Sequence, residues 1–314
     1  MGKFEHNISL SEGRSPLISL IVVLLLAFSG FQAIGPLIGV LLTLPFFDFN
    51  FMQAMEVLSN PVGNEEAKMP IFIIQGLASI IGFIVVPLLY LRFIEKKPLH
   101  IFFNSVSLGT VPVFLLTFIV LAFMFVNSIF IEWNANFKFP ESMAGLENML
   151  KSLEEAAKTQ TEFLTTFNGF SQFFLAFVVI AVIPAIGEEL LFRGFVQNLL
   201  IRISGNIHIA IWVAGFLFSA FHMQFYGLVP RMLLGVLFGY LYYWSGSLST
   251  AMVAHFINNG FTIIMMYLYQ QNLTSLDVDT EESLPLTFLL ILFVLFLGLI
   301  YFYRNFFLKH KTIG

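Results

Sequence analysis

Long apolar segments constrain this chain more than any other feature. The first, Leu17–Phe47, contains no charged residue and exceeds the roughly 20 residues that a helix needs to cross a bilayer. Of all residues, 58% are hydrophobic and only 11% are charged, whereas a soluble domain carries about 25% charged residues. Polar loops separate the first segment from seven more, with approximate bounds Met69–Leu91, Thr110–Ile131, Phe163–Arg202, Ile207–Met223, Met232–Trp244, Leu248–Tyr269 and Leu284–Tyr303. The sequence therefore predicts an all-α polytopic membrane protein with about eight transmembrane helices.

We expect one integral membrane domain over residues 1–314, because no internal repeat, low-complexity tract or soluble domain interrupts the pattern. The lipid bilayer is thus a partner, while a net charge of −4 and the lack of a long basic tract argue against nucleic acid. The chain has no cysteine, which excludes a disulfide framework, a thiolate metal site and a cysteine nucleophile. The first apolar segment is about twice as long as the apolar region of a signal peptide, so we expect no cleavable leader.

The charges between the segments predict the topology. Lysine and arginine concentrate in the N-terminal arm, the loop after the second segment, the connection around Arg202 and the C-terminal tail. The intervening loops are neutral or acidic apart from Arg231, and the last of them carries Asp277, Asp279, Glu281 and Glu282. Positive loops stay on the cytoplasmic side, so we predict that both termini are cytoplasmic.

Three local patterns predict departures from a simple bundle. Gly35-Pro36 is expected to kink the first segment, unless that segment overhangs the bilayer. The spacing of Gly235 and Gly239 allows a close helix–helix approach, which we interpret as packing. The connection Glu132–Gln160 predicts an amphipathic helix, either at the membrane interface or solvated and packed on a neighbouring loop. Its apolar residues at helical spacing are Met143, Leu146, Met149, Leu150 and Leu153.

Charged residues inside the fourth segment mark a functional site, because charges in hydrocarbon are costly. In the stretch 188–193, EELLFR, Glu189 and Arg193 are four residues apart and share a helical face, with the acid preceding the base. Glu188 is rotated by about 100° and has no partner within the segment. One acid is therefore expected to be neutralised locally, and the other to be free for chemistry. The alternative is a buried ion-pair cluster that only fixes helix packing.

Two later segments add polar residues. The stretch 218–222, FSAFH, ends in His222, and in 255–259, HFINN, the side chains of His255 and Asn259 share one helical face. Singly, each could be a hydrogen-bonded packing residue. Together with the acids they supply the base, donors and orienting groups of an active site.

Two hydrolytic chemistries fit this set. A carboxylate without a partner in a low-dielectric pocket is a competent base towards water, so water held between Glu188 and a histidine could attack an amide carbonyl. His222 and Asn259 could then donate hydrogen bonds to the oxyanion. Alternatively, Glu188, His222 and His255 could bind a divalent metal such as zinc that activates the water. The sequence contains no HExxH motif, and we expect no cofactor.

The three stretches resemble, in order, the EExxxR, FxxxH and HxxxN motifs of the CAAX-protease and bacteriocin-processing (CPBP or Abi) family of intramembrane proteases. The resemblance covers about residues 163–269. It implies that Glu188 activates water, that Glu189 and Arg193 support it, and that His222, His255 and Asn259 stabilise the oxyanion or hold the water. Members have been described both as metalloproteases and as glutamate proteases, and the residues slightly favour the metal-free alternative.

The sequence thus predicts an intramembrane endopeptidase that cleaves a membrane-associated peptide or protein, reached from the cytoplasmic side or laterally from lipid. Prenylated CAAX ends and bacteriocin leader peptides are both compatible substrates. A proton- or ion-coupled transporter could use the same polar residues as a relay, although the paired repeats of transporters are missing from the sequence. A non-catalytic membrane scaffold or immunity protein is the third alternative.

Overall fold

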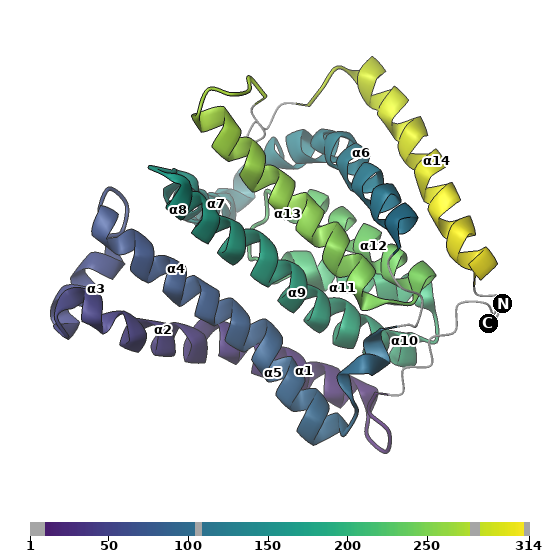
Figure 1. The fold of residues 1–314 in the computed structure, drawn as a ribbon, viewed down its shortest axis with the longest axis horizontal. Helices are drawn as coiled ribbons and strands as arrows, with labels where there is room; N and C mark the ends of the chain where they lie inside the picture. The colour runs from purple at the N-terminus through teal and green to yellow at the C-terminus, as the bar shows by residue number, and fades with distance from the viewer. Residues whose placement is uncertain (1–9, 104–108, 277–282, 311–314) are drawn as a thin grey trace.

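The computed structural model describes residues 10–103, 109–276 and 283–310, and in this part of the chain every regular element is helical (Figure 1). The N-terminal elements are α1 (Pro16–Ser29), η1 (Gly30–Ile34), α2 (Gly35–Thr43), η2 (Leu44–Phe47), α3 (Phe51–Ser59), α4 (Glu65–Ser79), η3 (Ile80–Val85), α5 (Val86–Leu89), η4 (Tyr90–Glu95), η5 (Leu99–Phe102) and α6 (Thr110–Ala135). The remaining elements are η6 (Glu141–Met143), α7 (Ala144–Thr165), α8 (Phe170–Ala176), η7 (Phe177–Val182), α9 (Ile183–Glu189), η8 (Leu190–Gln197), α10 (Asn198–Ser204), α11 (Ile207–Ala220), α12 (Leu228–Ser245), α13 (Leu248–Gln270) and α14 (Leu286–His310).

Six continuous helices in the described residues are long and apolar enough to cross a membrane. They are Pro16–Phe47, Glu65–Glu95, Thr110–Ala135, Phe170–Ser204, Leu248–Gln270 and Leu286–Lys309. Two of the eight predicted segments fall short of them: α11 is apolar but has only 14 residues, and the 18-residue α12 carries Arg231 and several tyrosines. The prediction of an all-α polytopic membrane protein is confirmed.

The helices form a bundle with α9 and α13 near its middle (Figure 1). On one side α2 packs along α4, and on the other α14 packs along α6. α11 lies against α12, and α13 contacts both η7 and α9. Only 11% of the residues in the apolar stretch of α14 are buried. Most of its apolar side chains therefore face outward, as expected for a helix in contact with lipid.

Several boundaries differ from the sequence prediction. The fourth segment begins at Phe170 and not near Phe163, because α7 continues to Thr165 and the chain then breaks at Gly169, whose backbone is extended. The fifth segment ends at Ala220, before His222. In the first segment, a π-helical turn precedes Gly35-Pro36, which agrees with a local irregularity there because proline cannot donate a backbone hydrogen bond.

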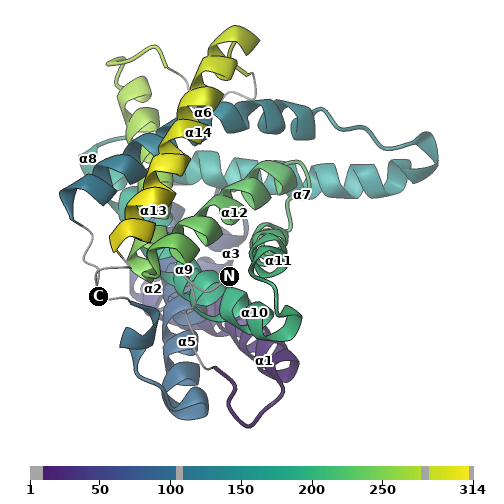
Figure 2. The ribbon, with the colours of Figure 1, turned by 90° about the vertical axis from the view of Figure 1, so that its right-hand side faces the viewer.

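The predicted amphipathic helix is present as α7. It forms a projecting arm with the end of α6 (Figure 2). Met143, Leu146, Met149 and Leu153 are exposed, so this face of α7 is not covered by the protein. Its location at the membrane interface stays a prediction.

The bundle has two ends, which we name the basic end and the α7 end. Three bonds assemble the basic end: Arg14 Nη2 to Glu95 Oε1 at 2.8 Å, Arg202 Nη1 to Ser11 Oγ at 3.1 Å, and the hydroxyl of Tyr303 to the carbonyl of Leu241 at 3.4 Å. The first two bonds join the segment before α1 to the last residues of η4 and α10, and the third joins α14 to α12. Asn198 of α10 donates to the hydroxyl of Tyr242 on α12, so these elements lie together. Its described basic residues are Arg14, Arg92, Lys96, Lys97, Arg202, Arg304 and Lys309.

The α7 end holds the last residues of α6, α11 and α13 and the first residues of α12 and α14. Glu132 near the end of α6 accepts a hydrogen bond from the Ser283 backbone, and Asn134 donates to the carbonyl of Phe225. This separation of charge agrees with cytoplasmic termini, which stay a prediction. Some charges of the predicted topology lie outside the described residues, namely Asp277, Asp279, Glu281, Glu282 and Lys311.

Candidate active site

A buried ion pair forms the centre of the site. α9 passes into the wider turn of η8, and over this junction Arg193 Nη1 lies 3.0 Å from Glu189 Oε1. Both residues are 0% exposed. The predicted pair between these two side chains is therefore present, and it is closed off from solvent.

Arg193 is held by a second helix. Its Nη2 donates to the carbonyl oxygen of Gly235 on α12 at 2.8 Å, and its guanidinium carbon lies 4.6 Å from the ring centroid of Phe218. A methyl group on Gly235 would come within 3.2 Å of that Nη2 and 3.0 Å of the Gly215 backbone on α11. Gly235 thus allows the close packing predicted from its spacing to Gly239, and it also binds the arginine directly.

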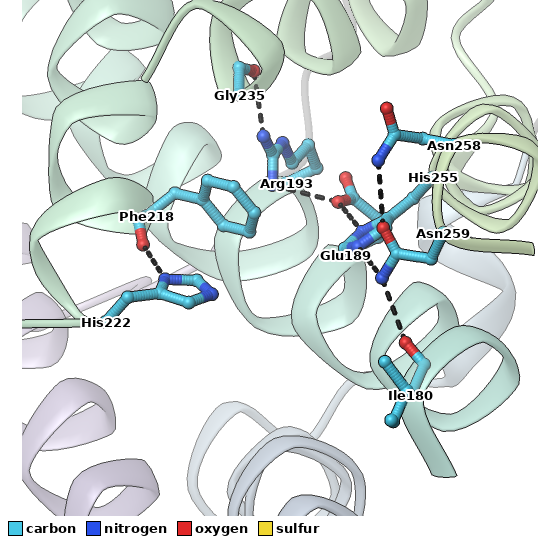
Figure 3. A network of polar contacts seen from close by, with 9 residues as sticks. All are labelled: Ile180, Glu189, Arg193, Phe218, His222, Gly235, His255, Asn258 and Asn259. Carbon is cyan, nitrogen blue, oxygen red and sulfur yellow. Dashed lines mark hydrogen bonds and ion pairs between the residues drawn. The ribbon is translucent and has the colours of Figure 1, made fainter. Parts of the chain in front are cut away.

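His255 joins the ion pair from α13 (Figure 3). Its Nδ1 lies 2.8 Å from Glu189 Oε1, and its Nε2 lies 3.2 Å from Asn259 Nδ2, which also donates to the carbonyl of Ile180 at 3.0 Å. Because an amide nitrogen only donates, Nε2 of His255 is the acceptor. The neutral ring then carries its proton on Nδ1 and donates it to Glu189.

The amide of Asn258 extends this network. Its Nδ2 donates to Asn259 Oδ1 at 2.9 Å. This bond orients the amide of Asn259 so that its nitrogen faces the carbonyl of Ile180. A continuous chain of hydrogen bonds therefore runs from Asn258 through Asn259 and His255 to Glu189. The two asparagines and His255 lie on α13, Glu189 lies on α9, and the carbonyl of Ile180 lies in η7.

Aromatic rings position the two histidines. His255 stacks on Phe238 at a centroid distance of 5.2 Å, and the Phe218 ring lies 6.0 Å from His255 and 5.3 Å from His222. Because α11 ends at Ala220, His222 lies in the turn that follows this helix, and the rings of His222 and His255 both contact the ring of Phe218.

His222 itself lies outside the hydrogen-bonded network. Its Nδ1 contacts the carbonyl of Phe218 at 3.0 Å, and because a carbonyl only accepts, Nδ1 carries the proton. The Nε2 lone pair is then left as an acceptor, and it contacts no hydrogen-bond partner among the described residues. In Figure 3 the ring extends towards the cluster around Glu189.

Glu188 differs from its neighbour in its contacts. It is half-buried and makes no hydrogen bond or ion pair within the described residues, whereas Glu189 Oε1 receives both Arg193 and His255. Arg231, which lies outside the network, interacts electrostatically with Glu188. The two adjacent acids therefore have the unequal environments that their helical positions predicted.

The dispersed metal set predicted as an alternative is not assembled. No group of three histidine or acidic side chains in the described part of the chain is arranged to hold a metal ion. His255 uses both ring nitrogens, one with Glu189 and one with Asn259, so it would have to release a hydrogen bond to become a ligand. As arranged, Glu188, His222 and His255 do not fit a zinc site.

Sequence reasoning missed several residues of the network. Two of them, Gly235 and Ile180, contribute only a backbone carbonyl, for which no residue type is a signal. No sequence signal marked Phe238 either, because aromatic residues are abundant throughout the chain. Asn258 stands inside the stretch HFINN, and its position beside Asn259 could have marked it.

Comparison with known proteins finds one family that is similar to the part of the chain that forms this site. Residues 170–261, which contain all three motifs, match the family described as type II CAAX prenyl endopeptidase Rce1-like. The match shows what residues 170–261 are similar to, and it covers less than half of the chain. The matched region contains the whole hydrogen-bonded network, including the carbonyls of Ile180 and Gly235 and the rings of Phe218 and Phe238.

A curated relative matches a shorter part of the chain. The uncharacterized protein YpbD of Bacillus subtilis (strain 168) is 31% identical over 84 residues, which cover 26% of this chain and 40% of YpbD. The match thus covers well under half of either protein. No solved structure matches this chain significantly.

Proposed function

We propose that this protein is an intramembrane endopeptidase in which Glu188 activates the hydrolytic water. The observation that carries the proposal is the division between the two acids. Glu189 is held by Arg193 and His255, while Glu188 has no hydrogen-bond partner in the described residues. A base must have a free lone pair within reach of the water whose proton it takes.

His222 supplies the second contact to the water. Its Nε2 is an acceptor in the observed arrangement. In the proposed mechanism the water donates one hydrogen to this nitrogen and the other to Glu188. Attack of the water oxygen on the scissile carbonyl transfers a proton to Glu188 and gives a tetrahedral oxyanion. Collapse of this intermediate breaks the C–N bond, and Glu188 returns the proton to the leaving amine.

We assign stabilisation of the oxyanion to the amide of Asn259. Both hydrogens of its amide are used, one towards Ile180 and one towards His255. A substrate carbonyl would therefore replace one of these acceptors and receive the N–H in its place. This assigns water holding to His222 and oxyanion stabilisation to Asn259.

Glu189 and Arg193 act through His255 and do not contact the water. Glu189 accepts the Nδ1 proton of His255 and so fixes the tautomer and the ring orientation, and Arg193 balances the charge of the carboxylate. The substrate is a peptide segment of a membrane-associated protein, and the description of the matching family makes a prenylated CAAX end the first candidate.

A comparison of membrane proteomes tests the proposal. The native protein and Glu188→Gln are expressed with the same tagged membrane proteome, and new protein N-termini are quantified by mass spectrometry. Exposed Glu56 on α3 provides a control, as Glu56→Gln. We expect new N-termini with the native protein and the control, and a loss of at least about 100-fold with Glu188→Gln. Equal N-termini in all three samples would contradict the proposal.

A further inference from the structure

A large cavity lies beside the network at the α7 end of the bundle. It has a volume of about 540 Å³, within the usual size of sites that bind small ligands, and its walls come from α6, α7, α12 and α13. A second hollow of about 470 Å³ adjoins it along the polar side of α7 and shares Ala135, Glu154, Lys158, Glu162 and Tyr226 with it. We name these two connected spaces the vestibule.

The vestibule reaches the candidate active site at two residues. Asn258 lines the cavity and donates to Asn259, the first link of the chain that leads to His255 and Glu189. Arg231 also lines the cavity and interacts electrostatically with Glu188. A molecule in the vestibule would therefore lie next to Asn258, which begins the hydrogen-bonded chain to Glu189, and next to Arg231, which interacts with Glu188.

Arg231 has an unused donor in this cavity. Its Nη2 donates to Gln224 Oε1 at 3.1 Å, while its Nη1 is buried and has no acceptor among the described residues. The nearby carboxylate of Glu154 accepts from Gln224 Nε2 at 3.1 Å and from the Tyr226 backbone at 3.2 Å, and it leaves Nη1 of Arg231 without an acceptor. A buried donor without an acceptor costs free energy, which an incoming acceptor would recover.

Gly227 has no side chain, and the guanidinium of Arg231 occupies the space that a side chain there would fill. A methyl group on Gly227 would lie 2.8 Å from Nη2 and 3.3 Å from Nη1 of Arg231, so the arginine packs directly on the glycine. Guanidinium groups bind carboxylates in a two-pronged geometry that lysine cannot reproduce. Both features favour an anionic group as the ligand of Arg231.

We propose that the vestibule binds a peptide segment and that Arg231 binds a carboxylate of that peptide. The proposal rests on the protease function and deepens it, because it names the group by which a substrate is recognised. The carboxylate can be the C-terminus of the peptide or an acidic side chain. Arg231 is then a specificity-determining residue. Asn258 connects a peptide in the vestibule to Asn259 through its hydrogen bond.

The test measures binding without cleavage. Protein that carries Glu188→Gln is purified into nanodiscs, and three fluorescein-labelled tetrapeptides are titrated by fluorescence polarisation: Ala-Leu-Ala-Leu with a free C-terminus, the same peptide amidated, and amidated Ala-Leu-Ala-Asp. Binding does not require turnover, so a failure of the proposed function and a failure of this inference give different results.

We expect at least one peptide with a carboxylate to bind about tenfold more tightly than the amidated peptide without one, a difference of about 1.4 kcal/mol. Arg231→Gln should remove this difference, Gly227→Ala should reduce it by displacing the guanidinium, and Arg231→Lys should keep part of it. Exposed Arg92 at the basic end is the control, and Arg92→Gln should change nothing. Preference for the free C-terminus alone identifies the C-terminal carboxylate as the ligand, and preference for the aspartate peptide alone identifies the acidic side chain. Tighter binding of both peptides shows that Arg231 accepts either carboxylate.

Two results would overturn the inference. One is equal binding, or no binding, of all three peptides by the Glu188→Gln protein. The other is a carboxylate preference that persists in a monodisperse Arg231→Gln variant.

Discussion

Removal of the Arg193 side chain should reveal how strongly the buried ion pair supports the fold. Arg193→Ala deletes the 3.0 Å contact to Glu189 and the 2.8 Å bond to Gly235, together with the contact of the guanidinium with the Phe218 ring at 4.6 Å. Glu189 is left as a carboxylate at 0% exposure with His255 as its remaining partner. Loss of one member of such a pair costs about 3–5 kcal/mol, and we expect a loss of this size.

The measurement is the free energy of unfolding in mixed micelles, followed by tryptophan fluorescence during an SDS titration. The double variant Glu189→Gln/Arg193→Ala should lose about 1–3 kcal/mol less than the sum of the two single variants, because the uncompensated charge has gone. The chain offers a pair with the same spacing in which the base is exposed, Glu147 and Lys151 at 2.7 Å. Lys151→Ala should leave the stability unchanged, since exposed pairs are screened by solvent.

A small effect of Arg193→Ala would refute this reasoning. If the variant loses less than about 1 kcal/mol, Glu189 is not a buried carboxylate that depends on Arg193. Additive losses in the double variant would lead to the same conclusion, because additivity means that the two side chains do not interact.

Three further predictions follow from the site and from the two ends of the bundle. Glu188→Gln should abolish cleavage and keep the protein folded, since the change preserves size and removes the base; a misfolded variant, judged by size-exclusion chromatography, would contradict the assigned division between the acids. Elemental analysis of the purified protein should find no stoichiometric metal, and about one zinc per chain, lost on chelation together with activity and restored with it, would overturn the mechanism and leave the protease proposal standing. Because the sequence contains no cysteine, single variants can report topology: a membrane-impermeant thiol reagent should label Ser152→Cys on α7 in intact cells and should not label Ser15→Cys at the basic end, and the reverse pattern would refute cytoplasmic termini.

The position of the vestibule bears on how a substrate reaches the site. It lies at the α7 end, whereas the beginning of α1 and the end of α14 lie at the basic end. If the termini are cytoplasmic, the vestibule lies towards the opposite side of the membrane, which favours lateral access from lipid over access from the cytoplasm. The thiol-labelling experiment therefore decides between these two routes as well.

Much of the architecture could be predicted from the sequence because helices in a bilayer satisfy their own backbone hydrogen bonds. Uncharged segments such as Leu17–Phe47 and Thr110–Ile131 were long enough to span, and each is helical in the structure. Positions four apart on one helix share a face whatever the tertiary fold, which is why the pair of Glu189 and Arg193 could be predicted. Asn259 and His255 follow the same rule.

Which helices pack against one another, and which of their atoms form contacts, depends on the tertiary structure. The bond between His255 and Glu189 joins positions 66 apart, and the bond between Arg193 and Gly235 joins positions 42 apart. Such contacts depend on helix packing and on turns such as the one after Ala220, which no residue pattern within a single helix determines. Local periodicity along this chain therefore fixed which side chains share a helical face, while the close approach of α11, α12 and α13 determined their partners, their tautomers and the position of the vestibule.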